Sequence, residues 1–306
     1  MTDRGLLDLI IARLPELSFR EKLQLCETLG GEGDLIRKSR PDIEALIGHK
    51  LSGFWDIDSM RQLAENDAKT AALRQIRWVP WSSPEYPPLL REIYDPPVLL
   101  FYRGKLPNPE KPLVAIVGTR KPSAHAAMQA FDIAKGLAAC GISVVSGLAL
   151  GIDAMAHRGT IEGGAASVAV LGSGVDALYP SSNRTLARRL LDTGGVIFSE
   201  YPPGTGPRKW NFPARNRIIS GIARGVLIVE APQKSGALIT ARFALDQNRD
   251  LWVASTGSTA SSGLSQVNAA LCDRRGTIKL AQDGAVIIHR ASDILGAWNI
   301  NVTKED

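Results

Sequence analysis

From residue 113 onward, short segments made almost wholly of apolar residues alternate with longer segments of helical character. Strands that are apolar at nearly every position are buried on both faces, as in a parallel sheet with helices on either side. Right-handed crossovers between such strands give a doubly wound, Rossmann-like α/β domain, whose ligand site lies at the carboxyl ends of the strands. The predicted strands are Leu113–Gly118, Ile142–Gly147, Ser167–Gly172, Val196–Ser199, Val226–Glu230, Leu251–Ala254 and Ala285–Ile288.

The first 75 residues predict a separate domain of about four helices. The apolar spacing from Leu7 to Leu14 fits one helix face, and the capping box Ser18-Phe19-Arg20-Glu21 opens a second helix. A third helix ends near Gly48, and a fourth covers residues 58–75. Residues 76–112 are dense in proline and aromatic residues, which predicts a connector of short strands and turns packed on the next domain. The sequence thus divides into residues 1–75, 76–112 and 113–306.

The chain of 306 residues has a formal net charge of +5 and is 44% apolar, which fits a soluble protein and is compatible with an anionic partner. Its cysteines, Cys26, Cys140 and Cys272, lie far apart, as is typical of reduced thiols. The apolar stretch near the N-terminus is too short, and too charged at its flanks, for a signal peptide or a membrane span. We therefore expect a cytoplasmic protein without membrane contact.

The loops after the predicted strands bring glycines, hydroxyls and cations to one edge of the sheet. Gly118 closes the first strand, and Arg120 and Lys121 follow it. Lys234-Ser235-Gly236 leads into a later helix, whose first turn has free N–H groups that attract an anion. The P-loop motif is absent, and no residue in these loops has the neighbours of an activated nucleophile. This set is typical of phosphate binding rather than of catalysis.

The loop after the second predicted strand leads into a helix with two side chains that could take part in catalysis or metal binding. Gly147 permits close backbone approach, and Asp153 and His157 lie four residues apart on one helix face. The two side chains could be a catalytic or metal-binding pair, or they could form a hydrogen bond that fixes the loop. Because no Cys or Glu cluster lies nearby, the structural interpretation is favoured, and we expect neither a catalytic residue nor a metal or cofactor.

The loop after the third predicted strand partly matches a dinucleotide-binding fingerprint. Gly172-Ser173-Gly174-Val175-Asp176-Ala177 fits GxGxxA, and Glu200 ends the next strand, where a ribose-binding acid would lie. That fingerprint requires a helix to begin within the glycines, whereas Tyr179-Pro180 interrupts here and the helix is expected only from Ser182-Asn183. A dinucleotide site is therefore disfavoured.

The segment FPARNR, residues 212–217, places polar groups at the start of a predicted helix within a basic stretch that also contains Trp210. Pro213 favours an extended conformation for Phe212, so the helix is expected to begin near Ala214. Consecutive helical side chains are about 100° apart, so Arg215 and Arg217 cannot point into the same pocket. One is expected to contact phosphate and the other to brace Glu200 or Glu230; the sequence leaves open which does which.

Six segments, in this order, closely resemble the DNA-processing protein A family (DprA, also called Smf): VAIVGTRKPS, SGLALGIDAMAH, VLGSGVDALYPSSN, SEYPPGT, FPARNRIISG and VEAPQKSGALITA. The resemblance implies an extended Rossmann fold preceded by a sterile-alpha-motif-like (SAM-like) domain. It implies a non-catalytic protein that binds single-stranded DNA, protects incoming DNA and loads RecA in natural transformation. It also implies contact with single-strand binding protein and a homodimer.

By motif match and loop position, the expected DNA-binding residues are Gly118, Arg120, Lys121, Gly147, Asn183, Arg184, Phe212, Arg215, Asn216, Arg217, Lys234, Ser235 and Gly236. The chain departs from the family at Ser181, where a lysine is frequent, and Arg184 is expected to supply that charge. A proline is missing from residues 254–257, and residues 258–275 look like an insertion, which puts the dimer in doubt. Many members carry a C-terminal winged helix, which is not expected here because the sequence ends at Asp306.

Two other functions remain possible from the sequence. A nucleotide-binding or phosphoribohydrolase-like enzyme of related Rossmann build would act on small nucleotides, but its PGGxGTxxE signature is replaced here by SGALITA, residues 235–241. The second alternative is an interaction scaffold with an incidental anion pocket.

Overall fold

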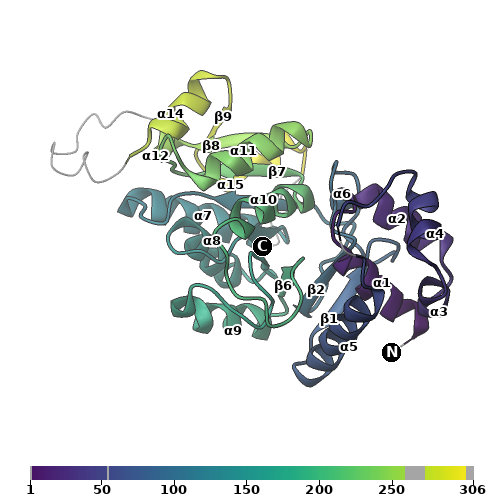
Figure 1. Cartoon of the computed structure of the whole chain (residues 1–306). Helices are drawn as coiled ribbons and strands as arrows, with labels where there is room; N and C mark the ends of the chain where they lie inside the picture. The colour runs from purple at the N-terminus through teal and green to yellow at the C-terminus, as the bar shows by residue number, and fades with distance from the viewer. Residues whose placement is uncertain (1, 54, 259–272, 301–306) are drawn as a thin grey trace.

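The computed structural model describes residues 2–53, 55–258 and 273–300, and its described part is built around one nine-stranded sheet (Figure 1). The order across the sheet is β1-β2-β6-β5-β4-β3-β7-β8-β9. The strands from β3 to β9 are parallel, while β1 and β2 form an antiparallel edge. The strands are β1 (Arg77–Pro80), β2 (Leu99–Gly104), β3 (Leu113–Val117), β4 (Ser143–Ser146), β5 (Val168–Leu171), β6 (Val196–Ser199), β7 (Gly225–Ile228), β8 (Asp250–Ala254) and β9 (Val286–Ile288).

The strand order creates one crevice in the middle of the sheet. The chain starts the parallel sheet at β3 and adds β4, β5 and β6 on one side, then returns to add β7, β8 and β9 on the other. Adjacent loops therefore leave β3 and β7 toward opposite faces, and ligands of open α/β sheets bind at such a reversal. The seven predicted parallel strands are all confirmed, within two residues at each end, and so is the doubly wound fold.

Helices cover both faces of the central parallel strands, β3 to β7, so these strands are buried on both sides. In β3, Val114 and Ile116 pack under one helical layer, and Ala115 and Val117 pack under the other. The first layer contains α7 (Ala124–Ala139), α8 (Ile152–Glu162), α9 (Arg184–Asp192) and α15 (Ala291–Ala297). The second contains α6 (Pro88–Arg91), α10 (Asn211–Ile222) and α11 (Gly236–Asp246). Shorter elements are the 3₁₀ turn η1 (Ser181–Asn183), α12 (Ser255–Ser258) and α14 (Arg275–Gln282).

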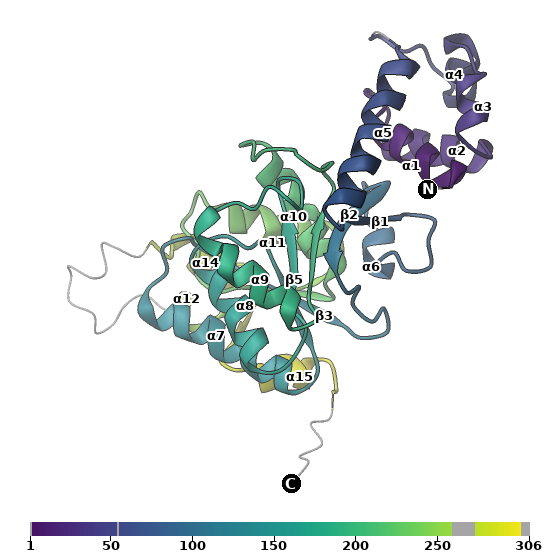
Figure 2. The same ribbon diagram turned by 90° about the horizontal axis from the view of Figure 1, so that it is seen from below.

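The N-terminal helices form a compact group beside the β1–β2 end of the sheet (Figures 1 and 2). They are α1 (Asp3–Arg13), α2 (Phe19–Thr28), α3 (Glu32–Ile36), α4 (Arg40–Ile47) and α5 (Ile57–Leu73). The predicted capping box is confirmed, since Ser18 Oγ accepts from the Glu21 N–H and Glu21 accepts from the Ser18 N–H. The short α3 was not predicted, because two glycines at its start concealed it.

The proline-rich segment of residues 76–112 is more closely joined to the sheet than the sequence indicated. Its two strands continue the main sheet, with β2 pairing antiparallel to β6. Tyr86 is fully buried, and its hydroxyl donates to the Pro97 carbonyl at 2.8 Å.

Most of the predicted insertion, residues 259–272, lies outside the described residues, as does Cys272. Among the helices that are described, none has both the length and the apolar character to cross a bilayer.

Two glycines in helices offer a matched test of this packing. A Cβ at Gly159 in α8 would lie 2.2 Å from the Phe131 carbonyl oxygen of α7, whereas one at Gly296 in α15 would meet open space. We expect Gly159→Ala to destabilise the protein by about 1–3 kcal/mol through overpacking. Gly296→Ala is expected to stabilise it by about 0.5–1 kcal/mol through helix propensity. Urea unfolding of both variants measures this, and equal effects of the two would contradict the close approach of α7 and α8.

Candidate functional site

A cleft of about 800 Å³ opens at the carboxyl ends of β3 and β7. Its walls are the loop after β3, the first turn of α10 and the first turn of α11. Four exposed cations from these walls face it, namely Arg120, Lys121, Lys209 and Lys234. Asp153 and Asp273 are the acids that line it, and Asp153 is buried. The exposed rim of the cleft is therefore strongly basic.

The loop after β3 is held in shape by its own backbone and by the end of β7. The Thr119 N–H donates to the Glu230 carbonyl at 2.7 Å, and the Lys121 N–H donates to Thr119 Oγ1 at 3.2 Å. Gly118 makes room for α8, since a Cβ there would lie 2.6 Å from Ile152 Cγ1. These contacts leave the Arg120 and Lys121 side chains on the exposed side of the loop.

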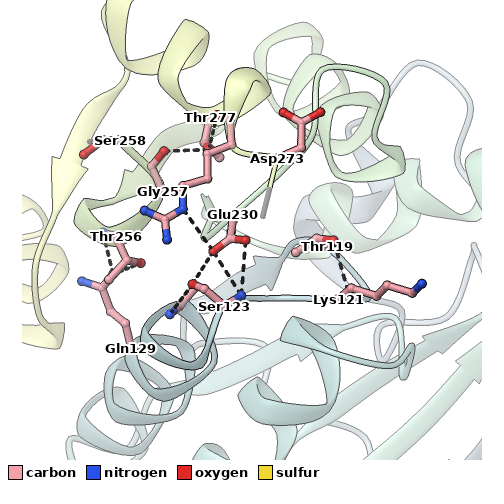
Figure 3. A network of polar contacts seen from close by, with 12 residues as sticks. Thr119, Lys121, Ser123, Gln129, Glu230, Thr256, Gly257, Ser258, Asp273 and Thr277 are labelled. Atoms are coloured by element: carbon pink, nitrogen blue, oxygen red, sulfur yellow. Dashed lines mark hydrogen bonds and ion pairs between the residues drawn. The ribbon is translucent and has the colours of Figure 1, made fainter. Parts of the chain in front are cut away.

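The carboxylate of Glu230 lies at the N-terminus of α7 and is fully buried (Figure 3). It accepts from Ser123 Oγ at 2.7 Å and from the Ser123 N–H at 3.3 Å, and Arg274 Nε lies 3.6 Å away. In a dinucleotide-binding Rossmann domain, the N-terminus of the first helix receives the pyrophosphate. Here the chain's own carboxylate holds that position, and the arginine that braces it is Arg274 rather than Arg215 or Arg217.

Arg215 forms the floor of the cleft and is only 5% exposed. Its Nη1 donates to the carbonyl oxygens of Gly147, at 3.1 Å, and of Val170. Gly147 is needed beside it, because a Cβ there would lie 2.6 Å from Arg215 Nη2. Burial lowers the pKa of Arg215 to about 10, against the attraction of nearby Asp153, so the guanidinium stays charged at neutral pH.

Arg217 points away from the cleft and is the bracing arginine of the pair. It forms a bidentate contact with Glu200, with Nη1 to Oε2 at 2.9 Å and Nη2 to Oε1 at 2.6 Å. Its Nε donates to the Asp95 carbonyl at 2.9 Å. The structure therefore confirms that the two arginines diverge, and it places Arg217 between α10, the end of β6 and the segment before β2.

Asp153 and His157, which their spacing in the sequence suggests as a pair, have different hydrogen-bond partners in the structure. Asp153 Oδ2 accepts from the N–H groups of Gly147, at 3.1 Å, and Ala149, at 3.4 Å, so of these two side chains Asp153 is the one that holds the loop after β4. His157 Nδ1 lies 2.8 Å from Ser167 Oγ, and both side chains are fully buried. Burial raises the pKa of Asp153. Burial and the charge of Arg215 lower the pKa of His157 to about 3, so this imidazole is neutral.

The aromatic part of the cleft is centred on Phe212. Its ring lies 5.6 Å from the ring of Tyr179, and the Arg120 guanidinium lies 5.9 Å from its centroid. The expectation that Phe212 is extended is wrong, because α10 begins at Asn211 and Phe212 lies in its first turn. Pro213 is tolerated there since the first N–H groups of a helix have no intrahelical partner. The earlier start gives the ring a fixed position.

Other predicted residues divide between the cleft and its supports. Asn216 donates to the Gly236 carbonyl at 3.1 Å and so joins α10 to α11, where Ser235 caps the helix by accepting from Ala237. Asn183 is buried and donates to the carbonyls of Leu148 and Ala149. The predicted residues that line the cleft are Gly118, Arg120, Lys121, Phe212, Arg215, Asn216, Lys234, Ser235 and Gly236.

Four predicted residues are not part of the cleft lining, namely Gly147, Asn183, Arg184 and Arg217. Arg184 is exposed at the start of α9, so the proposal that it replaces a family lysine gains no support from its position. Residues 172–177 form a turn rather than a helix start, with the Gly204 N–H donating to Asp176 at 2.9 Å, as expected from Tyr179-Pro180.

Tyr179 and Lys209 line the cleft but were not among the predicted site residues. The sequence could have indicated both, since Tyr179 belongs to one of the segments that resemble the family and Lys209 to the basic stretch before α10. The described residues contain no group of three or more His, Cys, Asp or Glu side chains placed to hold a metal ion.

Comparisons with known proteins identify a family whose model covers the part of the chain that contains these segments. The family model described as DNA recombination-mediator protein A matches residues 77–299. The chain is 49% identical to Protein Smf of Synechocystis over 173 residues, which are 55% of this chain and 43% of that protein. It is 40% identical to DNA processing protein DprA of Bacillus subtilis, over 73% of this chain and 72% of that protein. The match thus spans less than half of the Synechocystis relative.

Two solved structures share the fold over most of their length. DNA processing protein A of Streptococcus pneumoniae is 30% identical, with a TM-score of 0.72 and coverage of 97% of this chain and 98% of that chain. DNA processing protein A of Helicobacter pylori, whose structure concerns its single-stranded DNA binding mode, is 26% identical, with a TM-score of 0.61. That comparison covers 74% of this chain and 96% of the Helicobacter chain.

The neutral, buried His157 predicts a specific pH dependence of stability. Its pKa is about 3 when folded and 6.5 in an ordinary exposed state, so below pH 6.5 only the unfolded chain binds the proton. Stability is therefore lost as the pH falls. Relative to His157→Gln, the wild type is expected to lose about 2 kcal/mol between pH 7.5 and pH 5, from about 1.4 kcal/mol per pH unit. Urea unfolding at pH 7.5, 6 and 5 measures this, and a pH-independent difference would show that His157 is not buried as a neutral group.

Proposed function

Because the chain belongs to the DNA recombination-mediator protein A family, we propose that its cleft binds the sugar–phosphate backbone of single-stranded DNA. The observation that carries this proposal is that four exposed cations line the same cleft as the Phe212–Tyr179 pair. Cations that track phosphates, combined with rings on which bases stack, are the usual elements of single-strand binding. The Helicobacter relative, which shares this fold, binds single-stranded DNA.

Single strands are favoured over duplex DNA by the nature of the aromatic contact. A ring such as that of Phe212 can stack on a base only if that base is unpaired and turned out of a helix. Every base has a stacking face, so this contact carries little sequence preference. We therefore assign the cations to phosphate and the rings to bases of any identity.

We propose that the protein is not an enzyme. Glu230, the carboxylate nearest the end of β7, is fully buried and engaged by Ser123 and Arg274. Asp153 and His157 have separate partners, Asp153 buried in the cleft lining and His157 fully buried outside it. Two of these groups pair with a hydroxyl within hydrogen-bond reach, His157 with Ser167 and Glu230 with Ser123, but these pairs do not line the cleft, so neither can present a nucleophile to a substrate there. This argues against the phosphoribohydrolase alternative.

The wider role follows from the family rather than from the cleft. We propose that the protein protects incoming DNA in natural transformation, passes it to RecA and works beside single-strand binding protein. These steps are supported by the recombination-mediator family to which the chain belongs. We also propose a homodimer through β9, whose Val286 and Ile287 are 60% and 43% exposed at the outer edge of the sheet.

The salt dependence of DNA binding tests the cleft directly. If about five phosphates are neutralised, log K against log[salt] for an oligothymidylate is expected to have a slope near −3.5, from about −0.7 per contact. Arg120→Ala and Lys234→Ala should each weaken binding and reduce the slope by about 0.7. Fluorescence anisotropy at several salt concentrations gives both quantities. Mononucleotides are expected to compete poorly.

Arg217→Met is the matched control, because it removes a cation from α10 without touching the cleft. It is expected to lower thermal stability while the slope remains that of the wild type. Unchanged DNA affinity in both Arg120→Ala and Lys234→Ala would show that the strand lies elsewhere. Tight mononucleotide binding, or release of phosphate or free base from AMP or GMP, would favour the enzyme alternative.

The dimer is tested by light scattering during gel filtration. Val286→Lys places a charge on the exposed edge strand, so it is expected to convert a dimeric wild type into a monomer. Tyr94→Lys, at another exposed position outside β9, is the control and should leave the mass unchanged. A monomeric wild type, or a dimer that tolerates Val286→Lys, would contradict the β9 interface.

A further inference from the structure

Trp210 is a large apolar side chain left in solvent at the edge of the cleft. It occupies the N-cap position of α10 and is 68% exposed. Single exposed apolar residues are common and require no explanation by themselves. What distinguishes Trp210 is its position, because its neighbours Lys209, Phe212 and Pro213 all line the cleft while Trp210 itself does not. The indole therefore stands just outside the cleft, on the same helical turn as Phe212.

The surroundings of this indole are basic. The Arg208 guanidinium lies 5.9 Å from its ring centroid, within the range of a cation–π contact. The sequence has no Asp or Glu between Tyr201 and Arg224. The nearest acid along the chain, Glu200, has both carboxylate oxygens engaged by Arg217. No neighbouring acid in this stretch offsets the charge of Arg208, so the indole and the guanidinium together present a stacking surface beside a free cation.

The backbone beneath this surface is held by contacts of the first turn of α10. Asn211 is buried and donates to the Gly172 carbonyl at 3.0 Å, which ties the residue after Trp210 to the end of β5. One turn further, Arg215 is anchored to the ends of β4 and β5. The backbone under Trp210 is thus fixed by the same contacts that position Phe212, which lowers the entropy lost when a ligand stacks on it.

We propose that Trp210 and Arg208 form an outer stacking site, which takes one unpaired base and its phosphate from the part of a single strand that leaves the cleft. This rests on the proposed function, since it extends the path of the same strand. The indole has the largest π-face of the amino-acid side chains, and base–aromatic stacking tolerates any base. The proposed occupant is a nucleotide, because the indole can stack on its base while the neighbouring guanidinium of Arg208 binds its phosphate.

The experiment compares oligothymidylates of increasing length by fluorescence anisotropy. Oligomers short enough to fill only the cleft are expected to bind Trp210→Ala as tightly as the wild type. Longer ones are expected to bind it about fivefold more weakly, the lower end of the range for base–aromatic stacking. Trp210→Phe, which keeps a ring, should recover most of the loss. Tyr94→Ala removes a side chain that is 90% exposed and outside the cleft, so it should match the wild type at every length.

An abasic scan locates the base that stacks on Trp210. One abasic position near an end of a long oligomer is expected to weaken wild-type binding about fivefold and to leave Trp210→Ala unaffected. Because the scan on the wild type needs no substitution, it remains informative if a variant folds poorly. The outer site is overturned if Trp210→Ala binds long strands like the wild type, or if it weakens short and long strands equally. In both cases a loss of affinity in Arg120→Ala or Lys234→Ala keeps the proposed function intact, whereas unchanged affinity in both of these variants overturns the proposed function as well.

Discussion

The position of the cleft walls depends on the contacts of one buried group, the guanidinium of Arg215, with backbone carbonyls of the sheet. An isolated charge in the protein interior is costly, so it persists only where polar partners surround it. Here the partners are backbone carbonyls at the ends of β4 and β5, together with the nearby charge of Asp153. Because Arg215 belongs to α10, this contact fixes the helix against the sheet. The rings of Phe212 and Trp210, on the turn before it, take their positions from that anchor.

A second buried charge decides which helix ends are open to a ligand. The Glu230 carboxylate accepts from the cap of α7, and Arg274 joins it to the segment before α14. Nearby, Gln129 of α7 accepts from the Thr256 N–H and hydroxyl, so α12 is tied to the same helix (Figure 3). The position that a Rossmann domain usually gives to pyrophosphate is thereby filled. The cations that face the cleft lie instead in the loop after β3 and in the segments before α10 and α11.

The fold followed closely from the sequence, while the site followed only in part. Strands buried on both faces leave continuous apolar runs, so β3 to β9 were visible without the structure. The pairing of β2 with β6 was not, because a proline-rich segment carries no mark of its partner. Helical spacing showed that Arg215 and Arg217 diverge. Their assignment depended on where Glu200 and the Gly147 carbonyl lie in space, which no local pattern encodes.

Three glycines in the loops that form and support the cleft tolerate substitution less well than the rim does. A side chain at Gly118 would strike Ile152, one at Gly147 would strike Arg215, and one at Gly151 would lie 2.4 Å from the Thr119 carbonyl oxygen. Arg208, Lys209 and Trp210 project into solvent and have room to vary. Sequence drift in related chains is therefore expected to accumulate at the rim and to spare the floor. Lineages would inherit the same rigid floor and differ in the charge and the aromatic surface of its rim.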